Sequence, residues 1–431
     1  MHKRLLVACF VDSEGKVLKR ADLALSRAAL LEFAKKQLTQ EDQVVLEATT
    51  NTWAVTRLLK PYVAKVTIAN PLKTRLIAEA KVKTDKVDSE VLAQLLRMGY
   101  VAEVWQPDEK TSEMRSLTGR RAALTQGRTK VKNRIHALLA ERLIEVPATV
   151  RLFGGTGLAW LKTVELDEAG RLSMDSELRL LDSYGKEIEA IDEVIARKGA
   201  RDARIKLLVT LPGVGLNVAE ALVAAWGDPA RFKDADHAAS YLGLTPRTYQ
   251  SAAKCSHGPI TKAGNHHARW MLVEAAHHLS KNPGPLGVFF RRLEAKRGYN
   301  VATVAGARKL AAIAWHMLKS NQPYRYAQPI PTSVKLADLR IRGTGERRTR
   351  GPIPDGLKPR RSSTEVTLER IKALQDVYKD EQLPEIQDAP PGEARALEQM
   401  NVAEYVLQIR KTRFVEKPKR EGKRVNRTNR K

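Results

Sequence analysis

Three acidic residues in the first quarter of the chain have the types and spacing of a metal site. Glu47 ends the short apolar run QVVLE. Asp85 and Asp88 are three residues apart in KTDKVDSEVLAQLL, so both carboxylates lie on one face of a predicted helix. Oxygen ligands suit divalent cations such as Mg²⁺ or Mn²⁺, which activate nucleophiles at phosphodiesters. A structural role for the two aspartates, stabilising the beginning of the helix, stays open as the alternative.

A serine in a basic segment is the candidate nucleophile. Ser251 lies in YLGLTPRTYQSAAKCSHGPITKAGNHHARW, where we expect a loop of small residues. A hydroxyl near a phosphate can attack phosphorus while neighbouring cations stabilise the developing charge. An ordinary surface serine is the alternative. The cations of this segment, which we expect to contact nucleic acid, are Arg247, Lys254, Lys262 and Arg269.

The motif LPGVG, followed by LNVAEALVAAW, predicts a tight turn that leads into a helix. Gly213 and Gly215 permit such a turn, and the N–H groups at the beginning of a helix bind phosphate. Helix-hairpin-helix modules hold the DNA backbone with a loop of this kind. The motif therefore indicates phosphate binding, and the alternative is a connection in which the glycines serve only sterics.

The composition indicates a polyanionic partner. The 431 residues include 75 Lys+Arg and 49 Asp+Glu, a formal net charge of +26, and 43% of the residues are hydrophobic. These values exclude wholesale disorder and favour binding to nucleic acid. Two cysteines exclude a disulfide framework, and no apolar stretch is long enough for a membrane helix. We expect a cytoplasmic, nucleoid-associated protein without membrane contact.

The order of apolar patterns divides the chain into four regions. Residues 1–105 alternate strands with helices and predict an α/β domain. Residues 106–200 predict long helices that form a hairpin or coiled coil. Residues 201–330 predict helices that are interrupted by Gly and Pro. Residues 331–431 predict a basic linker, then helical patches near 364–380 and 392–412, and finally a basic tail. The cations expected to bind nucleic acid on the long helices are Arg120, Arg121, Arg128 and Lys132.

In this order, the motifs LEATTNTW, KTDKVDSEVLA, LPGVGLNVAEAL and LGLTPRTYQSAAKCSHGPITKAGNHHARWMLVEAA resemble one family. It is the insertion-sequence 110 family of DEDD-type transposases, with its 1111 subgroup, and the resemblance covers nearly all of residues 2–320. It implies an α/β RuvC-like (RNase H-like) N-terminal domain and a helical coiled-coil insertion. It also implies a mostly α C-terminal transposase domain with a helix-hairpin-helix-like element.

The resemblance carries roles onto single residues. Glu47, Asp85 and Asp88 match the second, third and fourth acids of the family, and Ser251 matches its serine nucleophile, with Ala252 where relatives have glycine. The first strand, with its aspartate, has no counterpart after Met1. We expect either that the start codon is misassigned or that the copy is decayed. Losing a central strand would leave backbone groups unpaired and three carboxylates for the metal.

The implied activity is recombination of DNA at the ends of an insertion sequence. The acids and Mg²⁺ (or Mn²⁺) would form a composite site with Ser251 of another protomer in a dimer or tetramer, guided by a noncoding bridge RNA. Two alternatives stay open. A metal-dependent junction nuclease would need the carboxylates without the serine, and a catalytically impaired remnant would bind DNA or RNA without cleaving it.

Overall fold

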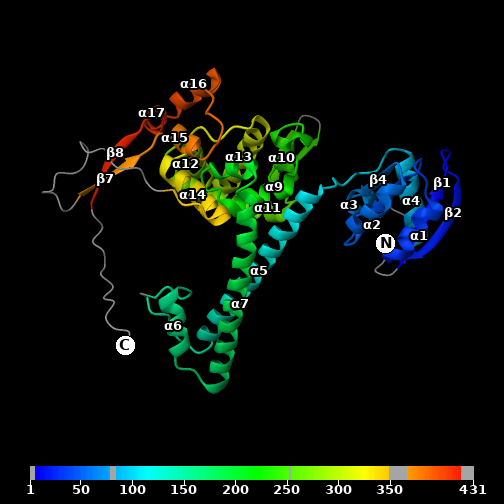
Figure 1. The fold of residues 1–431 in the computed structure, drawn as a ribbon, viewed down its shortest axis with the longest axis horizontal. Helices are drawn as coiled ribbons and strands as arrows, with labels where there is room; N and C mark the ends of the chain where they lie inside the picture. The colour runs from blue at the N-terminus through cyan, green and yellow to red at the C-terminus, as the bar shows by residue number, and fades with distance from the viewer. Residues whose placement is uncertain (1–4, 78–83, 149, 252–253, 349–365, 419–431) are drawn as a thin grey trace. The chain divides into compact units, whose positions relative to one another are not determined.

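The computed structural model describes most of the chain, which divides into two compact units, residues 1–108 and 109–431 (Figure 1). The described ranges are 5–77, 84–148, 150–251, 254–348 and 366–418. Ala252, residues 349–363 of the predicted basic linker and residues 419–431 of the predicted tail lie outside them. Each unit is described by itself.

The first unit alternates strands and helices, as expected from its sequence. Its elements are β1 (Leu5–Val11), β2 (Val17–Ala24), α1 (Arg27–Gln37), β3 (Gln43–Glu47), α2 (Thr52–Leu59), η1 (Lys60–Tyr62), β4 (Lys65–Ala69), α3 (Pro71–Ile77) and α4 (Asp85–Arg97). This mixture is compatible with a RuvC-like fold. In the described residues the strands form two separate pairs, and one continuous sheet is not present.

The first strand pair is an antiparallel hairpin of β1 and β2. Its turn is closed by the Asp12 carboxylate, which accepts hydrogen bonds from the backbone N–H groups of Glu14 (3.0 Å) and Lys16 (2.8 Å). Gly15 takes a φ of +91°, a conformation that favours glycine. This turn ends β1, so that the chain reverses and β2 covers one edge of the strand.

The second strand pair is parallel, because α2 carries the chain back from β3 to β4. Glu47 is the last residue of β3 and lies opposite Ala69 of β4. Helix α4 packs on both β1 and β3 and begins at Asp85, with the Thr84 hydroxyl accepting the Val87 N–H. The small core of this unit is Leu6, Leu30, Ala34, Leu46, Val55, Leu59, Val63 and Val66.

The second unit is mostly helical. Its elements are α5 (Glu109–Ala140), α6 (Gly155–Thr163), α7 (Glu168–Gly199), α8 (Ala203–Val209), α9 (Leu216–Trp226), η2 (Pro229–Arg231), α10 (Ala235–Tyr241), β5 (Pro246–Ser251), β6 (Lys254–Ile260), α11 (His266–His277), η3 (His278–Lys281), α12 (Pro285–Arg297), α13 (Tyr299–Ser320), α14 (Pro329–Thr344), β7 (Val366–Ile371), α15 (Leu374–Asp380), α16 (Pro391–Gln399), α17 (Ala403–Ile409) and β8 (Arg413–Pro418).

Helices α5 and α7 form an antiparallel hairpin that we call the arm (Figure 1). Ion pairs set the direction, because Arg121 meets Asp192 while Arg134, further along α5, meets the earlier Glu177. The arm has its own apolar core, formed by Val131, Ile135, Leu139, Leu152, Leu161, Met174 and Leu181. The structure therefore places a helical hairpin where the sequence predicts one.

The body of the second unit is built around α9. Every residue from Val218 to Trp226 is buried, which is typical of a helix at the centre of a core. Trp226 is fully buried and donates its ring N–H to the Ala238 carbonyl (3.2 Å). The same helix buries one carboxyl, Glu220, whose Oε1 has no hydrogen-bond partner in the described part of the chain.

The last hundred residues differ from the sequence prediction. Residues 331–344, predicted as linker, lie in α14, because Thr332, Leu336 and Leu339 bury one face of a helix that packs on α7 and α8. Residues 366–371, predicted as helical, form β7 and pair with β8 at the beginning of the predicted tail.

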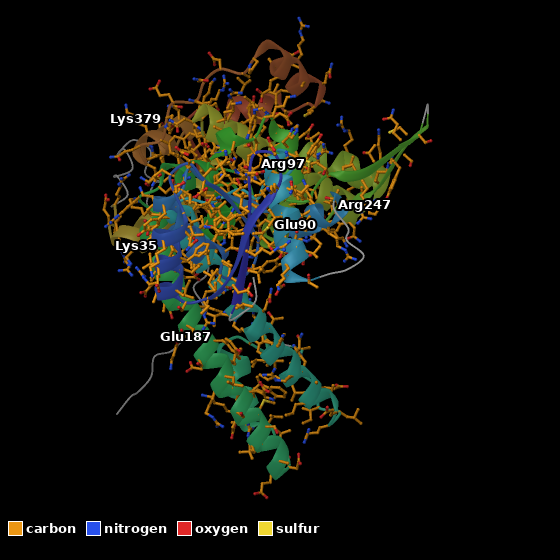
Figure 2. All side chains as sticks on the ribbon, turned by 90° about the vertical axis from the view of Figure 1, so that its right-hand side faces the viewer. Lys35, Glu90, Arg97, Glu187, Arg247 and Lys379 are labelled. Carbon is orange, nitrogen blue, oxygen red and sulfur yellow. The ribbon has the colours of Figure 1, made fainter. Side chains whose placement is uncertain are left out.

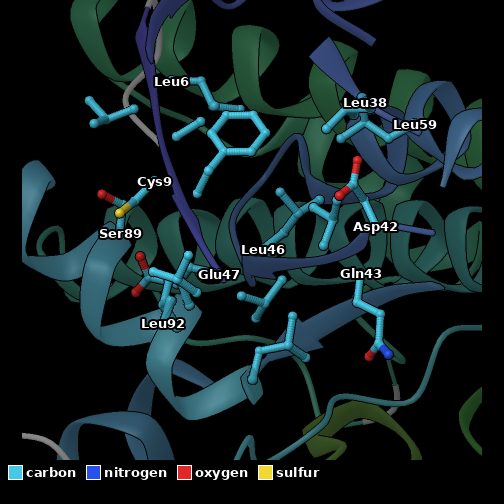
Figure 3. Close-up of a pocket in the computed structure, with 18 of the residues that line it drawn as sticks. Leu6, Cys9, Leu38, Asp42, Gln43, Leu46, Glu47, Leu59, Ser89 and Leu92 are labelled. Atoms are coloured by element: carbon cyan, nitrogen blue, oxygen red, sulfur yellow. The ribbon is translucent and has the colours of Figure 1, made fainter. Parts of the chain in front are cut away.

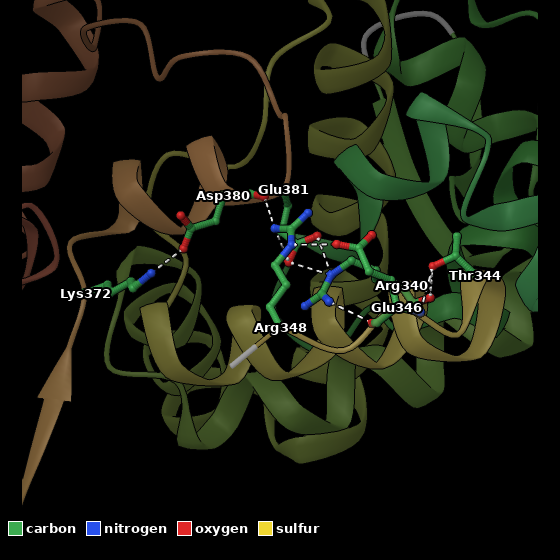
Figure 4. Close-up of polar contacts among 7 residues, drawn as sticks. All are labelled: Arg340, Thr344, Glu346, Arg348, Lys372, Asp380 and Glu381. Carbon is green, nitrogen blue, oxygen red and sulfur yellow. Dashed lines mark hydrogen bonds and ion pairs between the residues drawn. The ribbon is translucent and has the colours of Figure 1, made fainter. Parts of the chain in front are cut away.

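Ion pairs join α14 to the C-terminal segments (Figure 4). Arg340 on α14 contacts the Glu381 carboxylate (3.2 Å), and Arg348 reaches the same carboxylate. Lys372 pairs with Asp380 at the two ends of α15. Arg340 and Glu381 are mostly buried, so this contact fixes the C-terminal segments on the body.

Candidate active site and nucleic-acid interface

A groove of about 550 Å³ lies between β1 and β3 in the first unit (Figure 3). Its walls include the consecutive residues 5–13 and 41–47, whose side chains alternate between the two sides of each strand. The groove therefore runs along the strand edges. Strand β1 pairs with β2, and β3 pairs with β4, on the edges that face away from it. Within the described residues, no strand pairs with the facing edges.

The three predicted acids border this groove. Glu47 is at its β3 wall, while Asp85 and Asp88 are in the first turn of α4. The hydroxyl of Thr52 donates to the Glu47 carbonyl (2.9 Å) and fixes the backbone at the end of the strand. In the part of the chain that the structure describes, none of the three carboxylates forms an ion pair. Toward the described residues, their negative charges are therefore not compensated by an ion pair.

The donor chemistry of these acids fits a hard divalent cation, since all three offer carboxylate oxygens. Their arrangement is open. No group of three or more His, Cys, Asp or Glu side chains is close enough to hold a metal ion among the described residues. The acids that the sequence predicts together therefore share one groove without forming a closed ligand set, and further oxygen ligands would have to come from a bound substrate or water.

Ser251 lies at the end of β5, beside the tip of the β5–β6 hairpin, where the sequence predicts a loop. Strand pairing places it opposite Lys254, with two residues between them. Ser251 is exposed, and so are Arg247 on the same strand and Lys262 after the hairpin. The hairpin extends away from the helices of the second unit, with Arg247 on its surface (Figure 2).

Arg269, the fourth cation predicted in this segment, has a different position. It is 8% exposed, and its guanidinium donates to the Leu242 carbonyl (2.9 Å). Burial lowers the pKa of Arg269. The side chain therefore supports the turn between α10 and β5, and we leave it out of the interface proposed below.

The LPGVG motif forms the turn between α8 and α9. Gly213 has a φ of +75°, and a Cβ atom there would lie 2.2 Å from the carbonyl oxygen of Ala275 in α11. Only glycine fits this approach. Gly215 precedes the first residue of α9, and open space surrounds the position of its missing side chain. The two glycines thus have separate roles, one in packing and one at an accessible helix beginning.

The four predicted cations of the arm are not equivalent. Arg120 is exposed on α5. Arg121 is mostly buried and forms a two-atom contact with Asp192, so it stabilises the arm. Arg128 is half-buried, and Lys132 lies over the ring of Phe153 at 4.8 Å. Burial, together with the nearby arginines, lowers the pKa of Lys132.

Comparison with known proteins agrees with this division of the site. A model for DEDD-type transposases of IS110 elements matches residues 1–143, and a model for the transposase IS116/IS110/IS902 family matches residues 205–286. Together they cover a little over half of the chain. The chain belongs to the IS110 family of transposases. It is therefore a DNA transposase or recombinase, and the groove acids fall in the first match and LPGVG with Ser251 in the second.

Individual relatives of this IS110 family transposase have related names. A putative transposase of Sinorhizobium fredii is 28% identical over 319 residues, 70% of this chain and 79% of the relative. The transposase of insertion sequence IS1328 from Yersinia enterocolitica is 27% identical over 66% of this chain and 87% of its own length. A pilin gene-inverting protein of Moraxella bovis is 29% identical over 60% of this chain and 74% of its own length.

One signal in the sequence of this transposase was missed. Lys335 lies in the segment that the sequence predicts as basic linker, yet it reaches the carbonyls of the LPGVG loop. The helical spacing of Leu336 and Leu339, with the small Thr332 one turn before Leu336, could have identified the helix that carries it. In the described residues, no helix is long and apolar enough to cross a membrane.

Proposed function

We propose that this protein cuts and rejoins DNA at the ends of an insertion sequence, with the groove acids and Ser251 acting on the same phosphodiester. The observation that carries the proposal is that both the groove acids and Ser251 are open to a substrate. The groove acids have no ion-pair partner in the described chain, and Ser251 stands exposed beside the tip of a hairpin. Groups that are left open in this way are suited to a substrate that enters from outside.

The serine supplies the covalent step. Its Oγ loses a proton and forms a bond to phosphorus as the bond from phosphorus to the 3′ oxygen of the DNA breaks. The released 3′ oxygen takes up a proton, and the 5′ phosphate stays on Ser251. Attack by a second 3′ hydroxyl on this linkage reverses the chemistry and joins a new strand. Arg247, exposed four residues before the serine on the same strand, and Lys262, exposed beyond the base of the hairpin, would contact phosphates that flank the broken bond.

Glu47, Asp85 and Asp88 would hold Mg²⁺ (or Mn²⁺) only together with oxygen ligands of a bound substrate or water, because the three are not close enough to do so alone. When bound, the ion would supply charge stabilisation at the phosphate. The carboxylates themselves orient this charge toward the groove. Because the acids and the serine are in separate units, we propose that a dimer or tetramer brings the groove of one protomer to the serine of another.

Nucleic acid would contact several surfaces of the second unit. We propose that the LPGVG turn holds a backbone phosphate through the N–H groups at the beginning of α9. Arg120 and Arg128 on the arm would contact phosphates of DNA or of a noncoding bridge RNA, while Arg121 keeps the arm in shape. Contacts of this kind hold the backbone without reading sequence, so target choice would come from base pairing with the RNA.

The test replaces the serine and a matched neighbour on the same hairpin. Ser251→Ala removes the nucleophile, so we expect no strand exchange and no protein–DNA adduct in a recombination assay with the ends and RNA of the element. Ser256→Ala is the control, because Ser256 is also exposed and lies on β6 opposite Tyr249. Strand exchange by Ser251→Ala at the wild-type rate would refute the assigned role.

A second function is favoured by one observation, the location of all three acids in a unit without the serine. Such a unit supports a junction nuclease in which water attacks phosphorus. This activity would survive in Ser251→Ala and would leave no covalent adduct. The same assay therefore separates the two functions, because cleaved DNA without adduct identifies the nuclease.

A further inference from the structure

Lys335 on α14 reaches into the LPGVG loop. Its ammonium donates to the carbonyl oxygens of Leu211 (2.6 Å) and Val214 (2.9 Å), which lie at the two ends of the turn. Helix α14 packs on α7 and α8, so the lysine comes from a different part of the chain than the loop it holds. The mechanism above does not use this residue.

The charge on Lys335 is compensated in an unusual way. In the described part of the chain no carboxylate pairs with it, and the two carbonyls are its only hydrogen-bond acceptors there. Burial lowers the pKa of Lys335 to about 7, so a bound phosphate, which raises this pKa, would favour the charged form at neutral pH. A buried ammonium that lacks a counter-ion is costly, and a nearby anion would relieve this cost.

The peptide group between Val214 and Gly215 connects the lysine to the open side of the loop. In a trans peptide the C=O and N–H point in opposite directions, so the Gly215 N–H points away from the Lys335 ammonium. No acceptor binds this N–H in the described chain, and the space beside Gly215 is open. A cation at the carbonyl end polarises the peptide and makes its N–H a stronger donor.

We propose that Lys335 is the built-in cation of the LPGVG loop, a positioning residue that holds two carbonyls and so aims the Gly215 N–H at a nucleic-acid phosphate. The inference rests on the proposed function, in which this loop binds the backbone. It adds that phosphate binding by the loop depends on a positive charge from α14, on the side of the loop opposite the phosphate. The phosphate would in turn supply the anion that Lys335 lacks.

The first pair of variants tests the loop itself. Gly215→Asp and Gly215→Asn fit the open space, and both can cap α9, but they differ by one negative charge. If the loop holds a phosphate, the Asp variant of the full chain binds duplex DNA roughly tenfold more weakly than the Asn variant in a fluorescence anisotropy titration. Equal binding by the two variants would refute the function proposed for the loop.

The second set tests the lysine. Lys335→Met removes charge and donor, whereas Lys335→Gln keeps a donor without the charge. We expect both to weaken DNA binding about tenfold while Lys296→Met, at an exposed position of α12, has a smaller effect. If Gly215→Asp weakens binding but Lys335→Gln binds as tightly as the wild type, the lysine holds the loop only as a hydrogen-bond donor, and this inference alone is wrong.

A third measurement compares DNA affinity in two salts, and a purely structural role of Lys335 predicts no change in this comparison. Lys335→Ala leaves two convergent carbonyls, which are ligands for a monovalent cation. We expect DNA binding by this variant to be stronger in K⁺ than in tetramethylammonium at equal ionic strength, while binding by the wild type is the same in both. An identical ratio of the two affinities in variant and wild type would overturn the role of Lys335 as a cation, and thermal melting without DNA checks that each variant folds.

Discussion

The groove acids of the first unit and the buried ion pairs of the second unit differ in what their charged side chains contact. In the first unit, Glu47, Asp85 and Asp88 border an open groove, and no ion pair engages them in the described residues. In the second unit, the most buried ion pairs, such as that between Arg121 and Asp192, join helices to one another. The groove acids thus offer charge to a ligand, whereas the buried pairs of the second unit hold a scaffold. The ion pairs of the first unit, such as that between Arg20 and Glu90, are more exposed.

The largest expected effect follows from the open acids. Glu47→Gln, Asp85→Asn and Asp88→Asn should each lower the rate of strand exchange by about 10²–10³-fold, because each removes a carboxylate that would hold the cation at the scissile phosphate. Glu41→Gln is the matched control, since Glu41 is exposed on the same groove outside the three acids. Rates are measured with the ends of the element. Full activity of Asp88→Asn would break the comparison.

Truncating a side chain should cost more stability in the core of the second unit than in the core of the first. Trp226→Ala in the fully packed second unit should lower the free energy of unfolding by about 3–5 kcal/mol. Leu6→Ala should cost about 2 kcal/mol, at the low end for leucine, because Leu6 already borders the groove and part of its surroundings is open. Hydrogen exchange in denaturant reads each unit separately. A larger loss for Leu6→Ala would contradict the picture of a loosely packed first unit.

Glu220 differs from the three groove acids, because it is an acid buried in the core of the second unit. Burial, and then the charge of Asp202, raises the pKa of Glu220 to about 8. A raised pKa in the folded state contributes stability below the unfolded value near 4.5, and this contribution is lost as pH rises through 8.

Replacing this acid should change how stability depends on pH. Between pH 5 and 9, the free energy of unfolding should fall less for Glu220→Gln than for the wild type. We expect the difference to be a few kcal/mol in denaturant titrations. Glu187→Gln, at an exposed position of α7 (Figure 2), is the control and should behave as the wild type. Parallel pH profiles for the wild type and Glu220→Gln would show that the buried acid does not titrate in this range.

Local patterns were sufficient for the first unit. The alternation of strands and helices over residues 1–105 was predicted, and the apolar run QVVLE that ends at Glu47 coincides with β3. The sequence also predicted that Glu47, Asp85 and Asp88 belong together. It could not show how open their arrangement is, because that depends on packing between α4 and two strand pairs.

Contacts between distant segments were beyond local patterns. Strand β7 pairs with residues more than forty positions away, and nothing in its own sequence shows that partner. Arg269 looked like a surface cation, yet it reaches a carbonyl 27 positions earlier and is buried. Lys335 was concealed by the Gly, Pro and Arg content of its neighbourhood. In each case the tertiary partner decides the role of the residue.

The close approach of Gly213 to α11 has a consequence for where DNA is cut. Helix α11 follows the serine hairpin in the chain, and its Ala275 carbonyl abuts the LPGVG turn. If the LPGVG turn holds a phosphate and Ser251 is the nucleophile, as proposed above, this contact would fix the number of nucleotides between the held phosphate and the broken bond. A bulky residue in place of this glycine would then shift the cleavage position along the strand.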